Sequence, residues 1–87
     1  MIDPRLITLR TFAETGTIAA TAELTGYSTS AVSAQLRDLQ NSLGMTLLTK
    51  DGRGLRLTAT GRYLVRRSDR LLSVWEEIRA SSFTAGD

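Results

Sequence analysis

The stretch from Thr17 to Gly44, TIAATAELTGYSTSAVSAQLRDLQNSLG, decides the fold of this 87-residue chain. It predicts a short helix, a tight turn and a longer helix, because Ala22, Gly26 and Val32 stand at offsets of four and six residues. Ala22 allows a second helix to approach closely, and Gly26 can adopt a positive φ at the turn. Val32 would point back into the angle between the helices, and Ser28 would cap the second one. This is the pattern of a helix-turn-helix, whose second helix enters the major groove of DNA.

The longer helix, which we expect between the Ser28 cap and Gly44, has two unlike faces. Its apolar residues recur at helical spacing and should face the core: Val32, Leu36, Leu39 and Leu43. The opposite face is small or polar apart from one long cation, and comprises Thr29, Ser30, Ser33, Ala34 and Arg37. A face of small side chains would let the helix lie deep against another body. In the preceding helix, Ala22 should face inward and Thr21 outward.

The flanking segments complete a small mixed architecture. Asp3 and Pro4 predict the start of a first helix, with Asp as N-cap and Pro in the first turn. Two short strands, 45–50 and 55–57, flank Asp51-Gly52-Arg53-Gly54, whose two glycines suit a hairpin turn. This hairpin would be the wing of a winged helix-turn-helix.

The last helix, predicted over about residues 59–81, would be roughly 33 Å long at about 1.5 Å per residue, too long for so small a body to cover. Its residues at three- and four-residue steps indicate a coiled-coil seam and are Gly61, Leu64, Ser68, Leu71, Trp75 and Ile78. Trp75 fits either a buried position within the monomer or a dimer contact, and its place on a projecting helix favours the dimer. We therefore assign Leu64, Leu71, Trp75 and Ile78 to a dimer interface.

Composition excludes several functions. The chain has no cysteine and no histidine, and its carboxylates form no convergent pair, so neither a catalytic nor a metal site is expected and no cofactor is predicted. The apolar N-terminus is too short for a signal peptide and no run approaches membrane-spanning length, so a cytoplasmic protein is expected. Seven basic residues against two acidic ones fall between Lys50 and Arg70. They form either a solvated helix face or, as we favour, a stripe that faces phosphates.

The order of elements and the segment FAETGTIAATAELTGYSTSAVSAQLRDLQNSLGMTLLTKDGRGLRLTATG (residues 12–61) resemble the N-terminal DNA-binding domain of LysR-type transcriptional regulators. The matching residues are Phe12, Ala13, Glu14, Gly16, Ala22, Leu24, Ser28, Ser30, Ala31, Val32, Ser33, Leu36, Leu39, Leu43, Gly44, Leu47, Leu57, Thr58 and Gly61. The resemblance covers essentially the whole chain.

The resemblance implies a mainly α fold with a small β-hairpin. Its parts would be a winged helix-turn-helix over 1–58, a linker and dimerisation helix over 59–82, and a flexible end over 83–87. It implies a bacterial regulator that binds an interrupted inverted repeat in double-stranded DNA as a homodimer. Most members continue into a C-terminal domain that binds a small inducer; that domain is missing here, so we expect an excised fragment or, less favoured, a naturally short form.

The predicted DNA contacts fall into two groups. The base-reading candidates are the five small or polar residues of the longer helix, Thr29, Ser30, Ser33, Ala34 and Arg37. The candidates for the DNA backbone are Arg10, Ser28, Lys50, Arg53, Arg56 and Thr58. Three departures from the family pattern matter: Ala34 replaces a frequent Arg, Lys or Gln, Thr29 replaces a common Gln, and Leu48 and Lys50 replace a frequent Phe and Arg. The sequence that this helix reads is therefore expected to be unusual.

Two other functions remain open from the sequence. The last helix could be the functional element of a protein-interaction module, with the helix-turn-helix as its scaffold. Acidic residues in place of Lys50, Arg53 and Arg56 would have favoured that alternative, and none occurs. RNA binding is less favoured still, because Tyr27 is a lone aromatic at the turn and no platform for stacking bases is evident.

Overall fold

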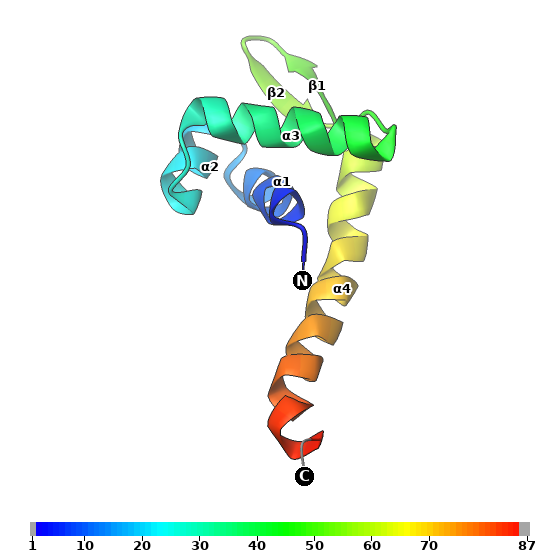
Figure 1. Ribbon diagram of the computed structural model, residues 1–87. Coiled ribbons are helices and arrows are strands. Elements are labelled where there is room, and N and C mark those ends of the chain that lie inside the picture. The colour runs from blue at the N-terminus through cyan, green and yellow to red at the C-terminus, as the bar shows by residue number, and fades with distance from the viewer. Residues whose placement is uncertain (1, 86–87) are drawn as a thin grey trace.

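The computed structural model describes residues 2–85, with side chains for residues 2–81. Its elements are α1 (Pro4–Thr15), α2 (Ile18–Thr25), α3 (Thr29–Leu43), β1 (Leu48–Asp51), β2 (Gly54–Leu57) and α4 (Ala59–Ala85). Figure 1 shows α1 beneath α3, α2 at one end of α3, the hairpin on the far side of α3, and α4 descending past the body. The predicted winged helix-turn-helix with a long last helix is confirmed.

Capping side chains and glycines fix the two ends of the helices, among them the predicted caps at Asp3 and Ser28. The side chains of Asp3, Thr17 and Ser28 each accept a backbone N–H of the first turn that follows. At the turn between α2 and α3, Gly26 has φ 81° and its N–H donates to the Ala22 carbonyl at 2.9 Å. A side chain at this φ would be strained, so the glycine sets the angle between α2 and α3.

The core lies where α1, α2 and α3 meet the residue that precedes the wing. Its buried apolar members are Leu6, Leu9, Phe12, Ala22, Val32, Leu36, Leu39 and Leu47. Ala22 and Val32 are buried as predicted, but Leu43 is 42% exposed and does not extend the stripe inward. Thr21 was expected to face outward and is fully buried, because its hydroxyl donates to the Thr17 carbonyl at 2.7 Å and is thereby satisfied.

The wing is shorter at its start than the sequence predicts. Residues 45–47 are not in a strand, and β1 pairs with β2 in antiparallel register, with Leu48 opposite Leu57 and Lys50 opposite Leu55. The side chain of Gln40 explains where the strand begins, since its Oε1 accepts the backbone N–H groups of Leu47 at 2.8 Å and Leu48 at 3.0 Å. One amide belongs to the residue before β1 and the other to its first residue, and both point to α3.

Helix α4 projects from the body (Figure 1), and the molecule measures 55 × 26 × 21 Å along its principal axes. The helix continues to Ala85, beyond the end near residue 81 that the sequence predicts, so residues 83–85 of the expected flexible end are helical. Of the expected flexible end, residues 86 and 87 lie outside the described residues. Within the described part of the chain, no helix is long and apolar enough to span a membrane.

Candidate nucleic-acid interface

The outward face of α3 carries all five residues predicted to read bases. Together they line one shallow depression on the surface: Thr29, Ser30, Ser33, Ala34 and Arg37. Thr29, Ser30 and Arg37 are exposed, whereas Ser33 and Ala34 are half-buried in the floor. The stripe of Val32, Leu36 and Leu39 fixes this orientation, because its burial turns the opposite face of the helix to solvent.

Ser28 extends this surface beyond the start of α3. Its Oγ accepts the Ala31 N–H at 3.1 Å, so the hydroxyl acts as the N-cap while its own proton can still be donated outward. The first backbone N–H groups of a helix also lack intrahelical partners and favour anions. The N-terminal end of α3 can therefore bind phosphate beside the base-reading face.

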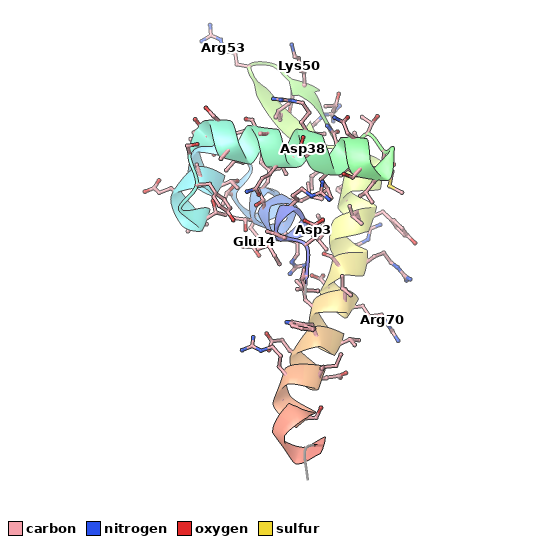
Figure 2. The ribbon with its side chains drawn as sticks, in the orientation of Figure 1. Asp3, Glu14, Asp38, Lys50, Arg53 and Arg70 are labelled. Atoms are coloured by element: carbon pink, nitrogen blue, oxygen red, sulfur yellow. The ribbon has the colours of Figure 1, made fainter. Side chains whose placement is uncertain are left out.

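The wing carries three exposed cations, Lys50, Arg53 and Arg56. Figure 2 shows Lys50 and Arg53 extending from the end of the hairpin, away from α3. The strand register places Lys50 on the same face as Leu55, whereas Arg56 shares the other face with Thr49. The three cations thus surround the tip of the wing on both faces.

The basic block between Lys50 and Arg70 is therefore not one continuous stripe, contrary to our interpretation of the sequence. Its first three cations belong to the wing, and the other four belong to α4. Among these, Arg62 donates to the Leu57 carbonyl at 3.0 Å, and Arg70 points outward from α4, well away from the wing (Figure 2). Arg62 therefore stays beside the base of the wing, whereas Arg70 lies farther along α4, which runs away from the hairpin.

Two of the six backbone candidates have other tasks in the fold. Arg10 turns toward α4, where its guanidinium bonds to Ser68 and Asp69. The Thr58 hydroxyl donates to the Thr46 carbonyl at 2.6 Å and accepts the Gly61 N–H at 3.0 Å, so it caps α4 and has no proton left for a phosphate. Ser28, Lys50, Arg53 and Arg56 keep the geometry that a backbone contact needs.

The predicted seam of α4 divides between two surfaces. Leu64 packs against the core and Ser68 is 3% exposed, so both face the body of the same chain. Leu71 and Ile78 are 49% and 52% exposed, and Trp75 is half-buried. The sequence reading missed Val74, which is 42% exposed, although Leu71, Val74 and Ile78 already show steps of three and four. We call these three residues the α4 stripe.

Among the described residues, the side chains with shifted pKa values lie away from this surface. Hydrogen bonds from the Arg5 side chain and backbone lower the pKa of Asp3, and the same pairing raises the pKa of Arg5. Among the described residues, no group of three or more His, Cys, Asp or Glu side chains could hold a metal ion. The α3 face and the wing present basic side chains, hydroxyls and methyl groups.

Comparison with known proteins agrees with this arrangement. Residues 5–62 match the family model described as a bacterial regulatory helix-turn-helix protein, lysR family. The HTH-type transcriptional regulator HdfR of Escherichia coli O139:H28 (strain E24377A / ETEC) is 38% identical over 74 residues, which are 82% of this chain and 26% of HdfR. The chain thus spans about a quarter of the length of the curated relatives it matches.

Solved structures give the same result. The DNA-binding domain of CbnR in complex with DNA superposes with a TM-score of 0.90 at 29% identity, over 100% of both chains. Full-length CbnR, a LysR family transcriptional regulator, matches 98% of this chain with a TM-score of 0.86 at 29% identity, and 29% of CbnR is covered. The BenM DNA-binding domain on benA site 1 DNA has a TM-score of 0.88 at 20% identity, which supports the fold alone.

Proposed function

The chain belongs to the lysR family of bacterial regulatory helix-turn-helix proteins, and from this premise we propose that it binds double-stranded DNA sequence-specifically. One observation carries the proposal: the five outward residues of α3 line a single depression. The fold around this depression matches that of the CbnR domain in a DNA complex over the full length of both chains. Its place of action would be the bacterial cytoplasm, and its role would be transcription regulation.

Base reading would rest on a deep approach of α3 to the major groove. The short hydroxyls of Ser30 and Ser33 can form hydrogen bonds with several different bases. The methyl groups of Thr29 and Ala34 can contact the thymine methyl. Arg37 is the one long donor on this face and can form a bidentate pair with guanine, a contact worth about 1–3 kcal/mol of discrimination. We therefore expect a half-site with one strongly specified guanine and several weakly specified positions.

The wing and the start of α3 would hold the DNA backbone. Lys50, Arg53 and Arg56 place basic side chains on both faces of the hairpin tip, so they can reach phosphates on either side of a groove. Ser28 would add a neutral hydrogen bond at the N-terminal end of α3. These contacts fix the register of the protein on the duplex without selecting a base.

A homodimer would bind two such half-sites as an inverted repeat. The α4 stripe leaves three large apolar side chains exposed on a helix that extends beyond the body. Exposed basic residues precede the last part of the stripe along the helix, and exposed acidic residues follow them: Arg66, Arg67 and Arg70 come before Glu76 and Glu77. A two-fold axis near the stripe would run the two helices antiparallel, and each basic segment would then face the partner's acidic one.

Selection of bound duplexes from a random pool, followed by footprinting at defined salt, tests sequence-specific binding. The Arg37→Ala variant should bind the selected site about 5–150-fold more weakly, which corresponds to 1–3 kcal/mol. Arg37→Lys keeps the charge but loses the planar fork, so it should retain non-specific affinity and lose discrimination at one base pair. Equal affinity of the wild-type chain for selected and scrambled duplexes would overturn the proposal and leave the α4 stripe as the surface of a protein-interaction module.

A further inference from the structure

A hydrogen-bonded clamp joins α1 to the third turn of α4. The Nη1 atom of Arg10 donates to the Ser68 Oγ at 2.9 Å and to the Val65 carbonyl at 3.4 Å, and it also forms an ion pair with Asp69. Ser68 is 3% exposed, and its hydroxyl proton goes to the same Val65 carbonyl at 2.6 Å. We call Arg10, Val65, Ser68 and Asp69 the Arg10 clamp.

Among the described residues, α4 has two hydrogen-bonded attachments to the body, of which the clamp is the second, and Leu64 and Val65 pack against the core between them. The first is the opening turn of the helix, where Thr58 caps it and Arg62 donates to the Leu57 carbonyl. A helix attached only at its beginning could pivot there, whereas attachment two turns later fixes its direction as well. Arg10 suits this task because a guanidinium has donors in a rigid plane and bonds only along fixed directions.

A small change in the direction of α4 at the clamp produces a larger displacement at the far end of the helix. Sixteen residues lie beyond Asp69 in the helix, which ends at Ala85. At about 1.5 Å per residue they form an arm of roughly 24 Å, so a change of about 10° at the clamp moves the far end by roughly 4 Å. One base pair advances the DNA axis by about 3.4 Å and turns the next site by about 35° around it.

We propose that the Arg10 clamp sets the angle at which α4 leaves the body and thereby selects the spacing between the two half-sites that a dimer accepts. The inference rests on the proposed function, since spacing has meaning only for a DNA-bound dimer. It makes Arg10 a positioning residue that touches no DNA, in place of the phosphate contact that the sequence suggested. Half-site affinity and half-site spacing then depend on different parts of the chain.

Arg10→Gln removes the clamp, and Arg5→Gln is its matched control. Arg5 lies on the same helix and carries the same charge, but it bonds to Asp3 and Ser42 and leaves α4 untouched. Binding is measured on duplexes with two selected half-sites whose separation changes one base pair at a time, and on a single half-site. Arg10→Gln should lower the preference for the best spacing over its neighbours at least threefold and keep single half-site affinity within twofold, whereas Arg5→Gln should keep the wild-type preference.

Two outcomes of this experiment would overturn the proposal. The first is an unchanged spacing preference in Arg10→Gln. The second is a loss of single half-site affinity of fivefold or more with the preference intact, which would make Arg10 a phosphate contact after all. Asp69→Asn is a second variant of the clamp that should not disturb folding, because the Asp69 side chain is 64% exposed and lies outside the core. It should shift the preference in the same direction by a smaller factor.

A measurement without DNA separates this proposal from the proposed function. The chain has no cysteine, so Glu23→Cys and Glu77→Cys place one spin label on α2 and one on α4, both at exposed positions. With labelled chains diluted in unlabelled ones, pulsed electron paramagnetic resonance should give a narrow distance distribution for the parent chain. Arg10→Gln should broaden it and Arg5→Gln should not; equal widths would refute the clamp. If Arg10→Gln broadens the distance distribution but the parent chain binds no duplex, the proposed function is refuted, whereas the role of the clamp in setting the angle of α4 is supported.

Discussion

Gly61 of α4 lies directly against the backbone of Leu47, so that a Cβ atom on Gly61 would stand 2.3 Å from the Leu47 carbonyl oxygen. The same carbonyl accepts the N–H of Thr58 at 2.9 Å, which holds it in place. The start of α4 therefore packs on the segment that leads into the wing, and only a residue without a side chain fits at the contact. One close approach thus couples the wing to the long helix.

Gly61→Ala should destabilise the chain. A methyl group in this contact must displace a hydrogen-bonded backbone carbonyl, and overpacking of this kind costs about 1–3 kcal/mol. The gain in helix propensity, about 1 kcal/mol at most, offsets only part of the cost. Urea unfolding measures the change, with Gly54→Ala as control because its nearest neighbour would be 3.8 Å away. Equal stability of the two variants would contradict the packing argument.

Asp3→Asn should make stability less dependent on pH. Hydrogen bonds from Arg5 lower the pKa of Asp3 in the folded chain below the ordinary value of 3.8. The carboxylate therefore stabilises the fold above about pH 3.8, and this contribution is lost as the pH falls through the lower folded-state pKa. Asn is an equally good N-cap, so the variant removes the charge and keeps the cap. Urea midpoints should differ at neutral pH and converge near pH 2; a constant difference would point to the cap instead.

Much of the fold follows from local chemistry that is visible in the sequence. The caps at Asp3 and Ser28, the turn at Gly26 and the inward stripe of Val32, Leu36 and Leu39 depend on neighbours within a few residues, and the structure has all of these. The outward face of α3 follows directly from burial of its other face. Helical periodicity therefore sufficed to predict which five residues would come together there.

The errors concern contacts between distant segments. Periodicity alone cannot tell which part of a long apolar seam packs on its own body, so Leu64 was grouped with Leu71 although it packs against the core of its own chain. The bond from Arg10 to Ser68 could not be foreseen, because the two residues are 58 positions apart in the sequence. The role of Gln40 in starting the wing was also missed, since a mid-helix glutamine gives no local signal for bonds to a later segment.

Replacing Gln40 by Met should loosen the wing while α3 stays intact. The variant keeps the size of the side chain but leaves the Leu47 and Leu48 amides without their acceptor, at a cost of about 1–3 kcal/mol for a buried group such as the Leu47 amide. Hydrogen exchange at these two amides should accelerate. Gln40→Glu retains an oxygen acceptor at the same place and should protect them. Slow exchange in both variants would show that the wing is held by its other contacts.

Arg53→Ala should weaken all duplexes by a similar factor. Arg53 is exposed at the tip of the wing (Figure 2), where a cation meets phosphate and no base edge is selected. Each neutralised phosphate contributes about 0.9 to the slope of log affinity against log salt, so the slope should flatten by about one unit. Arg53→Lys preserves the charge and should preserve the slope. A slope that Arg53→Ala leaves unchanged would remove this residue from the interface.

Leu71→Ala and Leu64→Ala should affect different quantities, because the two leucines lie on the same helix and face different surroundings. Leu64 packs on the core of its own chain, so its truncation should lower the free energy of unfolding of the monomer by about 1–3 kcal/mol, less than for a fully buried leucine. Leu71 is 49% exposed in the monomer and lies in the α4 stripe, so its truncation should leave monomer stability nearly unchanged.

In the proposed dimer, Leu71 is present twice, and its loss should weaken dimerisation by about 1.4 kcal/mol or more, which is tenfold in the dissociation constant. Whole-site affinity should fall with it, while half-site affinity should not. Analytical ultracentrifugation, urea unfolding and binding to whole and half-sites measure the three quantities. If the wild-type chain is monomeric at high concentration and binds a half-site as tightly as a whole site, the α4 stripe does not pair with a second copy. Trp75, already half-buried within the monomer, would then be part of the packing of α4 on its own chain.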